Sequence, residues 1–426
     1  MIGAPIFRYA LTPGWAGDRL TRAAQAVPSL DLNFAVTKNV GPLVSFTRAS
    51  SATYIDSAGT LQTAAVDVPR FDHNPTTGES LGLLVEEQRT NLLLRSEEFD
   101  NASWVLVSLA VTANQIASPS GSTSADLIAG SAGTANKYLY QIYTASTSGT
   151  FTFSVFAKAG TESFIVVRAV DQTGANEVRQ RFDLSSGTLN GSVAVGGTAT
   201  SGSASIAAFG NGWYRCSVTA TFAAFTQLQG NVWLNVYGST SLTTNYYAWG
   251  AQLEAGAFPT SYIPTTTAAA TRNADVASIT GSAFSSWYRQ DEGTMFAFSS
   301  SYGATNSSRR IAFASDGTTA NRFGLLYNNS NNPQIVVASA GTLTAIPSVA
   351  LTGATYAIAA AYKLDDYAIS AAGSAPSTDT SGALPVSINQ LSIGNQLNGE
   401  FLNGTIKRLT YWPQRLPNST LQAITQ

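Results

Sequence analysis

The sequence predicts an all-β protein with two β-sandwich domains, preceded by a region of short hairpins. Three observations support this prediction. The chain has 426 residues, which is too long for one ordinary domain. Hydrophobic residues make up 44% of it and charged residues only 11%, and its 36 Gly and 15 Pro suit strands joined by turns. Finally, short runs of alternating apolar and polar residues recur along most of the chain, which is the period-two pattern of half-buried strands.

The N-terminal part divides into an arm, residues 1–29, and a hairpin region, residues 30–95. Gly14–Ala26 is compatible with a short helix between two prolines. In the hairpin region, two short strand-like runs flank a turn that ends at Gly59. Glycine adopts a positive φ readily, so the turn predicts a hairpin over about residues 52–63.

Strand patterns are clearest in residues 96–264, which we expect to form the first sandwich. Two runs, 151–158 and 215–222, have apolar residues at every second position. In the second run the single cysteine, Cys216, shares a face with apolar residues, so it is expected in the core rather than as a nucleophile. About eight short strands at this spacing favour a sandwich over a barrel or an α/β sheet.

A Pro- and Thr-rich stretch at residues 265–275 reads as a linker to a second all-β unit, residues 276–426. Its strand-like runs include 295–298 and 323–327. The chain ends in a helical turn that Asn418 or Ser419 could cap.

Composition excludes several function classes. The net charge of −2 does not favour general electrostatic binding to nucleic acid or to an anionic membrane. One Cys rules out an intrachain disulfide, and one His leaves a Cys/His zinc site without ligands. Neither a signal peptide nor an apolar run of about 18 residues is visible, so we expect a soluble chain folded in the cytoplasm.

Three segments resemble known protein modules. Residues 30–104 strongly resemble a module of structural proteins of tailed bacteriophages and prophages, through Phe46–Tyr54, Pro69–His73, Gly78–Leu84 and Glu86–Leu93. The next segment is similar to jelly-roll carbohydrate-binding modules, through Trp249–Glu254 and Pro259–Pro264. The third looks like a concanavalin A-like or laminin G-like sandwich, through Leu391–Gly394, Phe401–Ile406 and Tyr411.

These resemblances imply a virion surface protein of the tail fibre, tail spike, head fibre or decoration type. Residues 30–95 would dock onto other virion proteins, and the two sandwiches, jelly-roll-like and lectin-like, would bind host-surface polysaccharide for adsorption. The expected assembly is a homo-oligomer, with a trimer as the first expectation, because many weak contacts multiply into avidity. No nucleic-acid partner and no membrane insertion are expected, and assembly would take place in the bacterial cytoplasm.

Hydrolysis of glycans is not expected, so the sequence predicts that the chain is not an enzyme. A glycosidase needs two carboxylates about 5 to 9.5 Å apart. Adjacent acidic pairs such as Glu86-Glu87 point to opposite faces of a strand, although carboxylates distant in sequence could converge. His73 could form a triad with Asp72 or Glu79, but no Gly-x-Ser-x-Gly turn is present. The favoured interpretation is that His73 and Asp72 shape the turn before Pro75.

Glycan binding needs rings that stack on sugars and polar groups that meet hydroxyls. The candidate residues in the two sandwiches are Tyr138, Tyr140, Trp233, Tyr237, Tyr327, Asn328 and Asn329. Sandwiches also bury aromatic residues, so a core position stays open for each ring.

No cofactor is expected apart from a structural calcium ion, for which the jelly-roll resemblance nominates Asp126 and Glu254. Two other functions also stay open. One is a purely architectural head or tail decoration or connector protein that binds no sugar, and the other is a capsule depolymerase.

Overall fold

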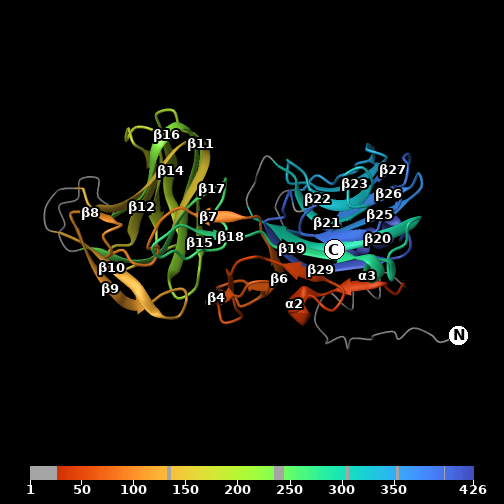
Figure 1. The fold of residues 1–426 in the computed structure, drawn as a ribbon, viewed down its shortest axis with the longest axis horizontal. Helices are drawn as coiled ribbons and strands as arrows, with labels where there is room; N and C mark the ends of the chain where they lie inside the picture. Colours follow the sequence, from red (N-terminus) through yellow and green to blue (C-terminus); the bar gives the residue numbers. More distant parts are fainter. Residues whose placement is uncertain (1–25, 132–135, 235–243, 303–306, 352–354, 398) are drawn as a thin grey trace.

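The computed structural model describes residues 26–131, 136–234, 244–302, 307–351, 355–397 and 399–426. Two β-sandwich lobes lie side by side along its longest axis (Figure 1). Antiparallel strands dominate both lobes, which confirms the predicted all-β fold class. The helix-compatible stretch from Gly14 lies outside the described residues except for Ala26. Within the described part of the chain, no helix is long and apolar enough to cross a membrane.

The first sandwich is built on one ten-stranded antiparallel sheet. Its strands are β8 (Val105–Val107), β9 (Leu109–Ala117), β10 (Thr123–Gly130), β11 (Tyr138–Ala159), β12 (Phe164–Asp171), β13 (Glu177–Asp183), β14 (Thr188–Gly196), β15 (Thr200–Ala208), β16 (Trp213–Leu234) and β17 (Asn245–Ala255). The two longest, β11 and β16, pair from Tyr138↔Trp233 to Lys158↔Trp213, with register shifts between Thr144 and Gly149. Such irregularities bend a strand pair, which lets β11 and β16 contribute to both layers around one core.

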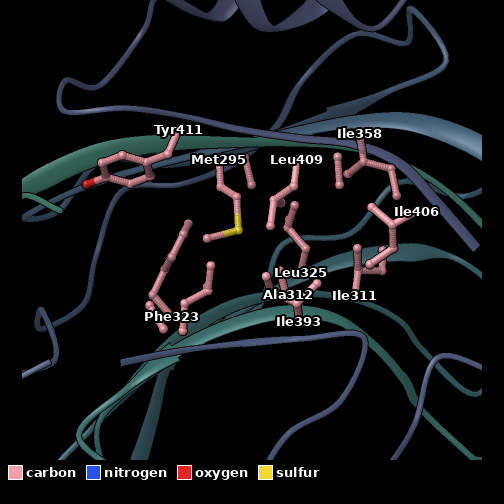
Figure 2. Close-up of a cluster of buried hydrophobic side chains, with 14 of the residues drawn as sticks. Met295, Ile311, Ala312, Phe323, Leu325, Ile358, Ile393, Ile406, Leu409 and Tyr411 are labelled. Carbon is pink, nitrogen blue, oxygen red and sulfur yellow. The ribbon is translucent and has the colours of Figure 1, made fainter. Parts of the chain in front are cut away.

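The second sandwich consists of two sheets that face each other. One contains β1 (Leu30–Leu32), β5 (Arg70–His73), β6 (Ser80–Val85), β20 (Glu292–Ser301), β25 (Thr355–Lys363), β26 (Tyr367–Ala371), β27 (Ser377–Asp379) and β29 (Gly404–Trp412). The other contains β2 (Ser45–Thr47), β19 (Val276–Thr280), β21 (Arg309–Ser315), β22 (Arg322–Tyr327), β23 (Pro333–Ser339), β24 (Thr342–Ala345) and β28 (Gln390–Ile393). Figure 2 shows Met295 and Leu409 from the first sheet facing Phe323 and Leu325 from the second across the core.

Residues 30–85 complete the second sandwich rather than forming a region of their own. Strand β6 pairs with β29, β1 pairs with β29, and β2 pairs with β19. Leu83 and Val85 are fully buried in the same core as Ile406. Alternation within a segment predicts strands but not their distant partners, which is why the sequence-based boundary at residue 95 differs from the strand pairing.

The first sandwich is therefore inserted into the second. The chain enters it through β7 (Arg89–Asn91) and leaves it through β18 (Ala270–Arg272), and these two strands pair with each other. The segment expected as a linker, residues 265–275, thus contains a strand. The predicted hairpin is present as β3 (Ala52–Ile55) and β4 (Leu61–Ala64), with Gly59 at φ 77° in its turn.

Buried ion pairs hold this junction together. Arg48 lies 3.0 Å from Asp275, and Glu86 lies 2.8 Å from Arg70 and 2.6 Å from Arg272. All five side chains are at most 1% exposed. Arg48, Arg70 and Glu86 belong to the segments that carry the phage-module resemblance, so those segments build the connection between the two lobes.

Three short helices complete the described fold: α2 (Phe34–Thr37), α3 (Gly281–Ser285) and α4 (Asn418–Ile424). Helix α4 packs Leu421 and Ile424 against Trp412 on the outer side of the β20–β29 sheet. Its N-cap position is Pro417, with no side-chain cap, so the predicted capping by Asn418 or Ser419 is wrong. The buried face of the helix stabilises it instead.

Candidate functional site

Two rows of side chains cross the outer face of the first sandwich. Leu139 and Val232 pair with each other and point into the core, so the residues beside them on β11 and β16 point outward. The strand registers place one row in the order Val107, Tyr138, Trp233, Val166 and Arg181. They place the next row in the order Val105, Tyr140, Asn231, Arg168 and Arg179.

Three aromatic rings of these rows form a stacked platform. Tyr138 and Trp233 stack with ring centroids 4.4 Å apart and an interplanar angle of 12°. Tyr140 stacks on Tyr138 at 5.8 Å and 30°. All three side chains are half-buried, so part of each ring meets solvent. The structure thus brings together three of the aromatic residues that the sequence nominated.

Charged groups border this platform. The guanidinium of Arg168 lies 5.8 Å from the Trp233 ring centroid, a cation–π geometry. Arg168 also pairs with Glu177 and donates to the carbonyl of Gly174 at 2.9 Å. Glu177 accepts a second ion pair from Arg179 at 2.8 Å. These contacts fix the orientation of Arg168 beside the rings.

Asn231 lies in the second row between Tyr140 and Arg168. Its side chain is fully buried, and neither its amide nitrogen nor its amide oxygen has a hydrogen-bond partner among the described residues. Buried polar groups are normally hydrogen-bonded, so a buried water molecule is the partner expected for this amide.

Taken together, the face offers flat rings, fixed guanidinium donors and a carboxylate acceptor. A sugar presents an apolar ring face and a rim of hydroxyls. The aromatic rings complement the ring face, and the charged and polar side chains complement the hydroxyls. The sequence did not single out Arg168, Glu177 or Asn231. Alternation along 164–171 could have placed Arg168 outward, opposite the buried Val167 and Ala169.

The other nominated glycan contacts lie elsewhere. Tyr237 falls outside the described residues. Tyr327 is fully buried in the core of the second sandwich, and its hydroxyl donates to the carbonyl of Ser299 at 2.9 Å, so its nomination is wrong. Asn328 accepts hydrogen bonds from two backbone amides of its own turn, and Asn329 is exposed there. That turn belongs to the other lobe and does not join the aromatic platform.

The two nominated calcium ligands are not brought together. Asp126 pairs across the sheet with Ala248, whereas Glu254 pairs with Thr152. Asp126 accepts hydrogen bonds from two backbone amides, and Glu254 accepts three from Gln252 and Thr260. In the described part of the chain, no group of three or more His, Cys, Asp or Glu side chains could hold a metal ion.

His73 and Asp72 hold a neighbouring strand rather than the turn before Pro75. Asp72 accepts from the Ile55 amide at 2.7 Å, and His73 Nδ1 lies 2.9 Å from the Ile55 carbonyl. Burial raises the pKa of Asp72 to about 6. The turn itself is held by Asn74, whose side chain accepts from two backbone amides. Cys216 is fully buried in the first core, as its position in the alternation predicted.

No protein-family model matches the sequence, and no curated protein is significantly similar to it. Solved structures do match. A carbohydrate-binding module of the Ruminococcus gnavus IT-sialidase, bound to α2,3-sialyllactose, is 16% identical, with 32% of this chain and 83% of that chain covered and a TM-score of 0.28. The NanB sialidase of Streptococcus pneumoniae is 15% identical over 34% of this chain and 26% of its own, with a TM-score of 0.29.

The Trypanosoma rangeli sialidase matches over 70% of this chain and 60% of its own, at 9% identity and a TM-score of 0.28. The β-sandwich fold described above rests on strand pairing rather than on these matches. They do include sialidases, which are glycosidases, and this finding contradicts the expectation from sequence that the chain is not an enzyme. That expectation is not carried further.

Proposed function

We propose that this chain is a carbohydrate-binding β-sandwich protein of a phage virion surface, and that it holds host-surface glycan on the outer face of the first sandwich. The observation that carries this proposal is the half-buried stack of Tyr138 and Trp233, flanked by Arg168. A solvent-facing stack exposes apolar ring surface to water. A sheet surface with a purely structural role does not need such exposure. A sugar ring placed on it would cover that surface.

The virion part of the proposal is supported by the resemblance of residues 30–104 to a phage structural module. In this fold that segment completes the second sandwich and ties it to the first through buried ion pairs. The second sandwich would thereby hold the first sandwich in a fixed position. Copies arranged symmetrically would multiply weak sugar contacts, and a trimer is the assembly we propose.

A glycan array probed with the purified full chain tests the proposal. We expect binding to a defined group of bacterial surface polysaccharides, and loss of that binding in Trp233→Ala. Leu364→Ala serves as the matched control, because this exposed leucine lies in the other lobe. A well-folded wild-type protein that binds no glycan would favour an architectural role instead.

A second measurement separates binding from cleavage. Each polysaccharide that binds is incubated with the protein, and reducing ends are counted over time. Release of reducing ends would identify a depolymerase, whereas binding without release would identify an adhesin. Labelled particles viewed by electron microscopy would test the virion location independently.

A further inference from the structure

A pocket lies between the two lobes, apart from the aromatic platform. Its volume is about 960 Å³, within the range of small-molecule sites. Its lining comes from the β3–β4 hairpin, from the turn after β5, and from β15 and β16 of the first sandwich. The aromatic platform residues Tyr138, Tyr140 and Trp233 are not part of this lining, so the two sites are separate.

Arg215 brings an unpaired positive charge to this pocket. Its guanidinium donates to the carbonyl of Thr260 at 2.5 Å and to the hydroxyl of Ser154 at 3.0 Å, which are both neutral groups. Among the described residues, Glu254 and Glu86 are close enough to act on Arg215 electrostatically but form no ion pair with it, and its buried Nε has no hydrogen-bond partner there. The guanidinium also lies 5.3 Å from the Phe156 ring centroid, which holds the side chain in place.

The nearest acidic side chains are already occupied. Burial lowers the pKa of Arg215 by more than Glu254 and Glu86 raise it. Glu254 accepts hydrogen bonds from Gln252 and from both the amide and the hydroxyl of Thr260. Glu86 pairs with two other arginines, as described above. A partly desolvated guanidinium that lacks its own carboxylate favours an anion supplied from outside.

His73 supplies an acceptor in the same lining. The histidine is 4% exposed, and its Nδ1 lies 2.9 Å from the Ile55 carbonyl. Because a carbonyl only accepts, Nδ1 carries a proton, and in the corresponding imidazole tautomer Nε2 is an acceptor. Nε2 has no partner among the described residues, so it is matched to a donor such as a ligand hydroxyl.

The remaining walls combine rings, hydroxyls and two carboxyl groups, Asp72 and Glu86, which are engaged by the Ile55 amide and by two arginines respectively. Tyr54, Phe209 and Phe258 contribute apolar surface, and Ser203 and Ser205 on β15 present exposed hydroxyl groups. The pocket therefore fits a ligand with three properties: a carboxylate to pair with Arg215, hydroxyls to bond with His73 and the serines, and an apolar face to contact the rings.

We propose that the pocket between the lobes binds an acidic sugar of the uronic acid class, with its carboxylate on Arg215 and a hydroxyl on His73 Nε2. This site is independent of the aromatic platform. It would let the protein recognise charged residues of a polysaccharide, whereas the platform selects ring faces.

A titration followed by ligand-observed NMR tests the proposal with two probes that differ only at one carbon. Methyl β-D-glucuronide carries the carboxylate, and methyl β-D-glucoside carries a hydroxymethyl group in its place. We expect the glucuronide to bind at least about tenfold more tightly, as for a charge-assisted hydrogen bond. Equal affinities, or no binding of the glucuronide, would overturn the proposal.

Two variants locate the binding. Arg215→Met keeps much of the side-chain volume and should remove the preference for the glucuronide. Because this change is partly buried, Ser205→Trp provides a second test: its exposed position lets an indole fill the pocket without disturbing the junction. It should abolish binding. Ser192→Trp, exposed on β14 away from the pocket, is the matched control and should leave glucuronide binding unchanged. Binding that survives Ser205→Trp, or that is lost equally in Ser192→Trp, would refute this location.

Discussion

The guanidinium of Arg70 lies 2.5 Å from the carboxylate of Asp275, although 205 residues of chain separate them. Asp275 also receives Arg48 at 3.0 Å, and both of its carboxylate oxygens are used. It follows β18, the strand through which the chain leaves the first sandwich. One fully buried carboxylate thus pairs with two arginines at the point where the inserted lobe is joined to its host.

Removing this charge should therefore destabilise the protein strongly. We expect Asp275→Asn to lower the free energy of unfolding by about 3–5 kcal/mol, because Arg48 loses its buried carboxylate and Arg70 loses one of two. Denaturant unfolding followed by tryptophan fluorescence measures the change. Asp291→Asn is the control, since Asp291 pairs with Arg289 at the exposed surface, where solvent screens the pair and its loss should change stability little. Equal effects of the two variants would contradict the role of Asp275.

Local sequence patterns predicted many of the strands and turns of this fold. They did not predict which strands distant in sequence pair with each other. Alternation placed Cys216 in the core, and the glycine turn identified the β3–β4 hairpin. Nothing in the segment around Leu83 reveals that its partner strand lies more than 300 residues later, at Ile406. Strand alternation gives two faces without saying which one is covered, because burial depends on the partner sheet.

The same reason explains the mixed outcome for the nominated aromatic residues. Tyr327 alternates with Leu326, and both turn out to be buried because each face of β22 is covered. Trp233 was correctly placed opposite Val232, but its stacking on Tyr138 depends on the register of β11 and β16. The register shifts along this pair have no visible signal in the sequence.

Gly82 should be irreplaceable for a steric reason. It lies in β6 at φ 88°, and a Cβ built there would be 2.1 Å from the carbonyl oxygen of Ile406 on the paired strand. Gly82→Ala must separate β6 from β29, so we expect a loss of several kcal/mol in stability, well above the cost of a positive φ alone. Thermal unfolding measures it.

Gly41→Ala isolates the backbone contribution. Gly41 also has a positive φ, 73°, but a Cβ there would meet nothing within 4 Å. This variant should cost only about 1 kcal/mol. If the two glycine variants melt at the same temperature, close packing of β6 on β29 is not what Gly82 provides.

Stability should fall in acid because of Glu86. Burial by itself would raise the pKa of this carboxyl, but Arg272, Arg70 and the Ser261 donors outweigh it and lower the pKa to about 2, from an ordinary value of 4.5. A folded-state pKa below the unfolded value gives stability that is present above pH 4.5 and is lost as pH falls toward 2. We expect a loss on the order of 3 kcal/mol across this window.

Asp72 contributes with the opposite sign. Burial raises its pKa to about 6 from 3.8, so its contribution is fully present below pH 3.8 and is lost as pH rises through 6. Melting temperatures measured from pH 2 to pH 8 should therefore show a maximum near pH 4–5 from these two groups. Glu86→Gln should flatten the acid limb, whereas Glu98→Gln, at a surface ion pair with Arg95, should leave it unchanged. An acid limb that persists in Glu86→Gln would assign it to other groups.

The single thiol should be inert in the folded protein. Cys216 is fully buried in the first core, and burial raises the pKa of its thiol, so little thiolate forms and no reagent reaches it. A chromogenic disulfide reagent should label the native protein at the rate of global unfolding and label the denatured protein at once. Ser205→Cys, exposed on the neighbouring strand β15, should react immediately under native conditions. Rapid labelling of native wild-type protein would show that this core opens locally.

Recognition on the aromatic platform should depend on both the rings and the cation beside them. Removing the Trp233 ring deletes the surface on which a sugar face stacks and also the stack with Tyr138. We expect Trp233→Ala to weaken binding of an array-positive glycan by about 1–2 kcal/mol, roughly five- to thirtyfold in Kd. Trp233→Phe keeps a ring and should recover part of that loss. Arg168→Met should also weaken binding, because it removes the guanidinium that borders the Trp233 ring and can donate to sugar hydroxyls. Calorimetry with the wild type and the three variants measures these differences, and a Trp233→Ala protein that binds as tightly as the wild type would move the glycan site away from this face.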